Sequence, residues 1–271
     1  MREIQDHKDF SICSWYGPFE HITPKTVILE LSEAVLKCFL FEEPSEDDSS
    51  EDSDGEETPL PGEFKEKLKN AFNTLGKTVF VKNNWHAPID AKMFSTGNTL
   101  KAESADDIKL FFTTSTVIQK DLFNIKGIPF CLALRKWISI HPAAEFRCIV
   151  VNDTLRGITS RDWPTFYAHF KEEGSEIVEN ISDFFLENIK AKFPRKNYVV
   201  DIVLSYPDKP FILDFGPLNS RTNLYAFSWK EIGPLLNKDF QDEIAPVFRY
   251  LECDIGIMIR EDALKKFRPK V

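Results

Sequence analysis

The chain has 271 residues, of which 42% are hydrophobic, and it carries a formal net charge of −9. Ten of its acidic residues lie in the stretch EEPSEDDSSEDSDGEE (residues 42–57), and the remaining 33 acids face 34 bases. The rest of the chain is therefore nearly neutral, which argues against the strongly basic surface of a nucleic-acid-binding protein. The length allows one large domain or two smaller ones.

Cysteine usage and hydropathy indicate the cellular compartment. The five cysteines are scattered without a CxxC pair, the five histidines show no metal-binding spacing, and the first ten residues, MREIQDHKDF, do not resemble a signal peptide. No apolar run approaches the ~20 residues of a membrane span. We therefore expect a cytoplasmic, monomeric protein with free, mostly buried thiols, which contacts neither membrane nor nucleic acid.

The first half of the chain mixes strand and helix patterns. SEAVLKCFLF (32–41) follows Ser32, a good N-cap residue, and fits either a short helix or a second strand. The acidic stretch at about 42–60 cannot bury apolar surface, so we expect a disordered insertion there. This insertion could be a solubilising loop or a substrate of acidophilic kinases. Strands are predicted at 26–31, 78–84 and 130–137, and helices at 62–75 and 104–112.

The second half is dominated by hairpins. Residues 145–162 predict a hairpin that turns at Asn152-Asp153, a helix is expected at about 172–192, and 199–216 predict a second hairpin. Hairpins without regular βαβ alternation favour an α+β fold with antiparallel sheets in two lobes. We expect an N-terminal lobe at 1–131 and a C-terminal lobe at 132–271.

Each strand of the second hairpin carries one aspartate. With a turn over residues 206–209, Leu204 would face Phe211 and Asp201 would lie directly opposite Asp214. Like charges across a strand pair are destabilising, so a cation is expected between them. Magnesium is the commonest choice, because it takes one or two carboxylates together with substrate phosphates. Two aspartates that cap turns or pair with lysines are the alternative.

Several other residue types suit a nucleotide site. Lys82 lies within an apolar strand and could hold a phosphate, or it could lie on a solvated face. The segment NNWHAPIDA (83–91) suits a loop over a ligand or an ordinary turn. LRKW (134–137) could offer strand-end backbone to an adenine, or form a surface cation cluster. Arg147, with Arg161 across the hairpin, could bind phosphate, or pair with Glu145.

Eight motifs follow one another in a specific order and spacing, namely SWYGPF (14–19), VFVKNNWHAPIDA (79–91), LALRKW (132–137), PAAEFRCIV (142–150), GITSRDW (157–163), VVDI (199–202), ILDFGP (212–217) and FSW (227–229). In this order and spacing the chain resembles the cell division cycle protein 123 family, from about residue 10 to residue 251. An acidic insertion near the N-terminal part is also typical of the family.

The resemblance implies a two-lobed ATP-grasp-like fold that binds ATP with magnesium. It also implies an assembly chaperone that binds the gamma subunit of eukaryotic translation initiation factor 2 and supports translation initiation and cell cycle progression. By motif, the metal ligands would be Asp201 and Asp214. The ATP-binding residues would be Lys82, Asn84, Trp85, Ala87, Asp90, Arg135, Lys136, Trp137, Glu145, Arg147 and Arg161.

This sequence departs from the family pattern at several positions. Gly216 replaces an asparagine that is usually a third metal ligand, so magnesium binding should weaken. Ile89 and Cys131 stand where an arginine and a glutamate are common, and the C-terminal tail is shorter. No nucleophile or general base is evident, which favours binding over turnover. An ATP-grasp ligase with an unknown acceptor, or a scaffold that has lost nucleotide binding, are the alternatives.

Overall fold

A computed structural model describes residues 2–40, 58–95, 97–205, 209–237 and 245–253. The chain forms two compact units: unit 1 holds residues 1–20 and 24–138, and unit 2 holds residues 21–23 and 139–271. The division lies after the lobe boundary that we expected at 131/132. The reason is that residues 131–136 form a strand that pairs with strands of unit 1 on both sides.

Unit 1 is built on a small antiparallel sheet. Its strands are β1 (Thr26–Glu30), β2 (Val79–Lys82) and β3 (Cys131–Lys136), in the order β1-β3-β2. All three predicted strands are therefore present. The central strand β3 is buried along most of its length, as its apolar sequence CLAL requires.

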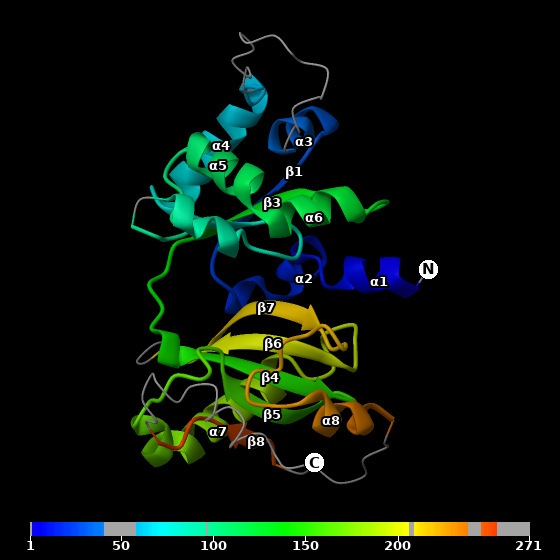
Figure 1. The fold of residues 1–271 in the computed structure, drawn as a ribbon, viewed down its shortest axis with the longest axis vertical. Helices are drawn as coiled ribbons and strands as arrows, with labels where there is room; N and C mark the ends of the chain where they lie inside the picture. The colour runs from blue at the N-terminus through cyan, green and yellow to red at the C-terminus, as the bar shows by residue number, and fades with distance from the viewer. Residues whose placement is uncertain (1, 41–57, 96, 206–208, 238–244, 254–271) are drawn as a thin grey trace, which may run out of the picture. The chain divides into compact units, whose positions relative to one another are not determined.

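Helices pack around this sheet, and Figure 1 shows α3, α4 and α5 gathered beside it. The stretch after Ser32 is a helix, because the Ser32 side chain accepts a hydrogen bond from the backbone of Val35. Ser104 and Asp107 form a capping box at the next predicted helix. The α-helices of unit 1 are α1 (Arg2–Asp9), α2 (Ile12–Phe19), α3 (Glu33–Phe39), α4 (Gly62–Leu75), α5 (Ala105–Thr114) and α6 (Thr116–Asn124), with the 3-10 helix η2 (Ile89–Phe94). A further 3-10 helix, η1 (Glu20–Ile22), begins in unit 1 and continues into the short segment 21–23 of unit 2.

Unit 2 contains a five-stranded sheet in the order β7-β6-β4-β5-β8, and Figure 1 shows β7, β6, β4 and β5 side by side in this sequence. The predicted 145–162 hairpin turns at Asn152 and Asp153, which adopt φ values of 53° and 58° that these two residue types tolerate. The short strand β8 pairs in parallel with β5, so the sheet is mixed and not purely antiparallel. The strands are β4 (Glu145–Val151), β5 (Thr154–Ser160), β6 (Tyr198–Val203), β7 (Phe211–Pro217) and β8 (Val247–Arg249).

The register of the β6–β7 hairpin differs from the prediction at one end. Asp201 does pair with Asp214, as expected. Phe211 pairs with Val203, however, and the predicted pairing with Leu204 is wrong. A bulge between Asp201 and Ile202 shifts the ladder by one residue beyond the aspartates. The turn residues 206–208 lie outside the described part of the chain.

The two faces of this sheet are covered differently. On one face, Phe146 packs against Phe170 of helix α7 (His169–Asn188), whose apolar side is buried. On the other face, Ile149 and Val199 form an apolar cluster with Ile232 of α8 (Trp229–Ile232). Two 3-10 helices, η3 (Pro142–Ala144) and η4 (Gly233–Asn237), complete the unit.

The predicted disordered insertion at 42–60 falls almost entirely on residues 41–57, which lie outside the described residues. Within the described ranges, no helix is both long enough and apolar enough to cross a bilayer.

Candidate functional site

The opposed aspartates of unit 2 belong to a polar row that crosses four strands. Thr159 of β5, Arg147 of β4, Asp201 of β6 and Asp214 of β7 are successive Cα partners. Residues that pair directly across neighbouring strands project from the same face of the sheet. The predicted magnesium and phosphate ligands Asp201, Asp214 and Arg147 are therefore brought together by the sheet register alone.

The cation beside Asp201 in this row is an arginine. Arg147 donates from Nε to Oδ1 and from Nη2 to Oδ2 of Asp201, both at 2.8 Å, which is a bidentate pair. Its third nitrogen, Nη1, donates to the backbone oxygen of Asn223 at 2.9 Å. Asp201 is only 4% exposed, so this neutralisation is needed for the strand to bury the carboxylate.

A second arginine joins the same carboxylate. The Nε atom of Arg161 lies 3.5 Å from Oδ2 of Asp201, and its Nη1 atom donates to Oε2 of Glu145 at 3.2 Å. The charge of Asp201 raises the pKa of Arg161 above its ordinary value. Burial raises the pKa of Glu145, and the charge of Arg161 partly offsets that effect. The predicted alternative of a Glu–Arg pair is thus present within the proposed site.

Tyr225 is a site residue that the sequence did not single out. Its ring lies 5.1 Å from Cζ of Arg147, and its hydroxyl accepts from Nε of Arg161 at 3.4 Å. Its φ is 52°, an unfavourable value for a bulky residue. Tyr225 has no motif of its own, and its only sequence signal is its position two residues before FSW (227–229).

Gly216 lies on the face that carries the polar row. Its Cα partner is Val199, two residues before Asp201, and a Cβ at position 216 would meet Cγ2 of Val199 at 3.1 Å. A side chain at 216 would therefore project to the side of Asp201 and Asp214, but glycine supplies no ligand oxygen.

Two carboxylates fit a magnesium ion that also takes oxygens from a bound phosphate, since Mg²⁺ rarely uses an all-protein cage. In the described part of the chain no group of three or more His, Cys, Asp or Glu residues could hold a metal. The donor set therefore suits a metal–nucleotide complex better than the metal alone. A carboxylate oxygen that accepts from arginine keeps a further lone pair for a ligand.

In unit 1, Lys82 is at the end of β2 and is 2% exposed. It is not on a solvated face, so that alternative is wrong. Its charge acts on the nearby thiol of Cys131, on the central strand β3. Lys82 is thus a buried cation at a strand end, which is what the nucleotide hypothesis requires of it.

The side chain of Asn84 is bound within the protein. Its Nδ2 donates to Oγ of Ser11 and to the backbone oxygen of Pro129, both at 3.0 Å, and its Oδ1 accepts from the backbone of Cys131 at 2.8 Å. Asn84 is 1% exposed. These contacts tie α2, β2 and β3 together, and a direct contact of its amide with ATP stays a prediction.

Trp85 and Asp90 make comparable internal contacts. The indole of Trp85 donates to the backbone oxygen of His7 at 2.6 Å. Asp90 accepts from Oγ of Ser115 at 2.5 Å and from N and Oγ1 of Thr116 at 2.8 and 2.7 Å, which fixes η2 to the start of α6. Burial raises the pKa of Asp90, but these hydrogen bonds outweigh it and lower the pKa below its ordinary value.

The remaining predicted residues of unit 1 lie along or near the sheet. Arg135 is buried on β3 and donates from Nε to Oγ1 of Thr26 at 3.3 Å, whereas Lys136 is exposed. The ring of Trp137 lies 5.3 Å from Nζ of Lys101, and Ala87 is half-buried before η2. The LRKW segment is therefore not a simple surface cluster. The adenine-binding role of these residues stays a prediction.

The motifs GITSRDW and FSW are linked by packing. A Cβ at Gly157 would meet Cζ of Phe227 at 2.7 Å, so only glycine lets this ring lie against β5. Arg249 of β8 lies over the Phe227 ring, with Cζ 4.4 Å from its centroid, and pairs with Glu231. Glu231 also accepts from Oγ of Ser228 at 2.7 Å. These contacts attach β8 to the sheet beside the polar row.

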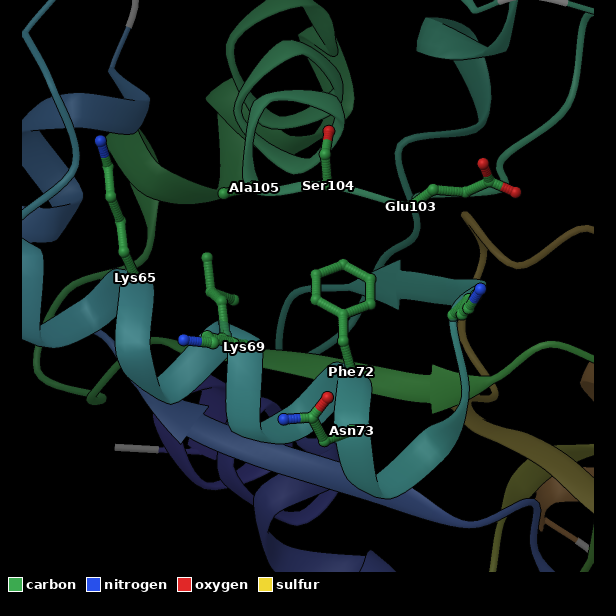
Figure 2. Close-up of a pocket in the computed structure, with 9 residues that line it drawn as sticks. Lys65, Lys69, Phe72, Asn73, Glu103, Ser104 and Ala105 are labelled. Atoms are coloured by element: carbon green, nitrogen blue, oxygen red, sulfur yellow. The ribbon is translucent and has the colours of Figure 1, made fainter.

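A cavity of about 420 Å³ lies elsewhere in unit 1, between α4 and the segment that precedes α5. Figure 2 shows Lys65, Lys69 and Phe72 on one side of it and Ser104 on the other. None of the predicted ATP-binding residues lines it, so it is not part of the predicted site.

Comparison with known proteins identifies the family. A translation initiation factor eIF2 assembly protein of Xenopus laevis is 30% identical over 283 residues, which cover 90% of this chain and 83% of that protein. The protein of the same name from Schizosaccharomyces pombe is 27% identical, covering 88% of this chain and 81% of its own length.

The solved structures agree. The structure of Cdc123 from Schizosaccharomyces pombe matches with a TM-score of 0.78 at 25% identity, over 91% of this chain and 97% of that chain. This confirms an α+β fold like that of Cdc123. The likeness of this fold to ATP-grasp proteins comes from the family resemblance and stays a prediction. The family model described as D123 matches residues 39–268. The chain therefore belongs to the D123 family, as the resemblance to the cell division cycle protein 123 family predicted.

Proposed function

We propose that this protein is an ATP- and magnesium-binding assembly factor for eukaryotic translation initiation factor 2, acting in the cytoplasm through the factor's gamma subunit. Family membership and the names of its relatives as eIF2 assembly proteins support the assembly role. Through that role the protein would support translation initiation and cell cycle progression. The gamma subunit and the cofactors come from the family resemblance.

The polar row of unit 2 is the observation that carries the nucleotide proposal. The row brings two carboxylates and Arg147 onto one face of one sheet, and Arg161, which follows β5, adds a second guanidinium beside Asp201. A phosphate site requires mainly fixed positions and neutralised charge. Asp201 and Asp214 would hold magnesium, and Arg147 and Arg161 would stabilise phosphate oxygens.

The other residues would orient the nucleotide. Lys82 would place a point charge on a phosphate, and Glu145 would keep Arg161 directed along the sheet, as it does now at 3.2 Å. Tyr225 would hold both guanidinium groups in position, through its ring at Arg147 and its hydroxyl at Arg161. Magnesium, when bound, would neutralise phosphate charge. The remaining ATP-binding residues, Asn84, Trp85, Ala87, Asp90, Arg135, Lys136 and Trp137, would shape the site in unit 1.

Calorimetric titration tests the cofactor proposal. We expect ATP to bind only with magnesium, and magnesium alone to bind weakly. Asp214→Asn should weaken the binding of magnesium-ATP by roughly 10–100-fold. Asp153→Asn is a matched control, because it makes the same chemical change at the β4–β5 turn, at the other end of the strands. Equal affinities for all three proteins would contradict the proposed metal site.

Gly216→Asn supplies the missing ligand. We expect it to tighten magnesium-ATP binding, provided that Val199 shifts by a few tenths of an ångström to accommodate the new Cβ. Gly216→Ala controls for the added bulk without an oxygen. An unchanged affinity in Gly216→Asn would mean that position 216 does not face the metal.

Affinity purification tests the assembly role. The tagged full chain, purified from its own cells with magnesium-ATP, should recover the gamma subunit of initiation factor 2. The Asp214→Asn variant should recover less. If the wild-type chain recovers other proteins and never the gamma subunit, the assembly role is wrong for this family member. Substrate-dependent release of ADP would instead favour a ligase.

A further inference from the structure

A pair of cysteines that are distant in sequence meet in unit 1. The Sγ atoms of Cys13 on α2 and Cys131 on β3 lie 2.6 Å apart and share a hydrogen bond. Both cysteines are free, with no disulfide bond between them. A disulfide bond is about 2.05 Å long, so these atoms need to approach by only about half an ångström to be bonded.

The surroundings hold this pair in place. The backbone of Cys131 donates to Oδ1 of Asn84, and Nδ2 of the same amide lies 3.9 Å from Sγ of Cys13. The backbone of Ile12 donates to the backbone oxygen of Asn84 at 2.8 Å. Asn84 thus positions both α2 and β3, which fixes the two thiols opposite each other.

The two thiols differ in exposure. Cys13 is exposed to solvent, whereas Cys131 is 2% exposed. The hydrogen bond shared with Cys131 lowers the pKa of Cys13 to about 7, against the opposing effect of burial. That same hydrogen bond, together with burial, raises the pKa of Cys131. An exposed thiol with thiolate character reacts with oxidants first, and a buried neighbour then resolves the product.

We propose that Cys13 and Cys131 are a reversible redox pair, in which Cys13 is the peroxide-reactive thiol and Cys131 is the resolving thiol. This proposal goes beyond the assembly function and does not depend on nucleotide binding. It names a modification site in which α2 becomes covalently attached to β3.

The chemistry balances with hydrogen peroxide as the oxidant. The Cys13 thiolate attacks one peroxide oxygen and breaks the O–O bond, and with one proton this gives the Cys13 sulfenic acid and water. The Cys131 sulfur then attacks the Cys13 sulfur, which forms the S–S bond. The Cys131 proton leaves with the displaced hydroxide as a second water. A dithiol reductant reverses the change by thiol–disulfide exchange.

Oxidation should stabilise unit 1. The bond would join residues that are 118 positions apart. Crosslinks that close long loops restrict the unfolded chain most strongly. Because the native sulfurs are already close, little distortion of the fold opposes this gain. We expect the melting temperature of the protein to rise by roughly 5–10 °C on oxidation, and to return to its original value on reduction.

Peptide mapping of the full chain tests the proposal. The reduced protein is treated with hydrogen peroxide, quenched with N-ethylmaleimide and digested with trypsin. We expect a linked pair of peptides, DFSICSWYGPFEHITPK (9–25) and GIPFCLALR (127–135), that disappears after dithiothreitol. The melting temperature should rise and fall with this pair. Separate alkylation of both peptides after peroxide would overturn the proposal, as would a link from Cys13 to any other cysteine.

Variants separate the two roles. In Cys131→Ser the sulfenic acid of Cys13 should persist and be trapped by dimedone, whereas Cys13→Ser should leave Cys131 unreacted. Cys253→Ser removes the other exposed cysteine and should leave the link unchanged. Cys131→Ala repeats the test if the serine variant is unstable. If Cys131 is oxidised in Cys13→Ser as fast as in the wild type, Cys13 is not the reactive thiol.

Discussion

Asp201 is buried, and its carboxylate depends on arginines from the β4–β5 hairpin rather than from its own. Arg147 makes two hydrogen bonds to it and Arg161 adds a third charged contact. The positive charges of these two arginines offset the repulsion expected between Asp201 and Asp214. The same charges remain available to a phosphate, so one set of side chains serves both stability and binding.

Removing Arg147 should therefore cost stability directly. We expect Arg147→Met to lower the free energy of unfolding by about 3 kcal/mol, because it leaves a buried carboxylate poorly neutralised. The double variant Arg147→Met/Asp201→Leu should recover most of that loss. Urea denaturation of the single and double variants measures the coupling. Losses that simply add would show that the pair is not energetically linked.

Asp90 should make stability depend on acid pH. Its pKa is lowered in the folded protein from 3.8, so its stabilising effect is fully present above the unfolded pKa. That effect is lost as the pH falls through the lower, folded pKa. Asp90→Asn should cost about 1–2 kcal/mol at pH 7, and the difference from wild type should shrink below about pH 4. Exposed Asp183→Asn is the control for urea midpoints at each pH.

At the scale of elements, two glycines in unit 2 differ in the space that their surroundings leave for a side chain. Gly157 lies on β5 directly beneath the Phe227 ring, whereas Gly174 lies within α7, where an added Cβ would be 3.5 Å from Cδ1 of Phe248. The first leaves no space for a methyl group, and the second leaves ordinary contact distance. The same substitution should therefore have opposite effects at these two positions.

Gly157→Ala should destabilise the protein by about 1–3 kcal/mol, because Phe227 must move off β5. Gly174→Ala should be neutral or stabilise by up to about 1 kcal/mol, since alanine favours the helix. Thermal melts of both variants measure the contrast. A neutral Gly157→Ala would mean that Phe227 and the β8 strand can move without cost.

Local patterns predicted most of these elements. The Asn152-Asp153 turn identified the first hairpin, the expected turn over 206–209 identified the second, and the apolar periodicity identified α4 and α7. The helix α2 was missed because it contains Gly17 and Pro18, which usually interrupt helices. The three-residue strand β8 was too short to show a period, and its parallel pairing accompanies a tertiary contact, the packing of its Arg249 over the Phe227 ring.

The site was predicted less completely than the fold. The pairing of Asp201 with Asp214 could be predicted by counting residues outward from the expected turn between the two strands. Asn84 binds Ser11, and Trp85 binds His7, by hydrogen bonds between residues more than 70 positions apart. No local pattern distinguishes such contacts from ligand contacts. The position of Tyr225 depends equally on the folded sheet.

At the scale of the whole molecule, the chain comprises two compact units, each with its own sheet and core. Multi-domain proteins often depart from two-state unfolding. We expect differential scanning calorimetry to resolve two transitions, with Asp90→Asn lowering one and Arg147→Met lowering the other. A single transition that both variants lower equally would show that the units unfold together.

The polar row has a consequence for the order of folding. Its arginines come from one hairpin, β4–β5, and its aspartates from another, β6–β7. Each hairpin can form locally, but helix α7 separates them in sequence, and the β4–β6 ladder joins them in the folded sheet. Local contacts form faster than distant ones, because less chain entropy is lost. We therefore expect the Arg147–Asp201 pair to form only when the two hairpins dock, so that the proposed binding face would be completed late in folding.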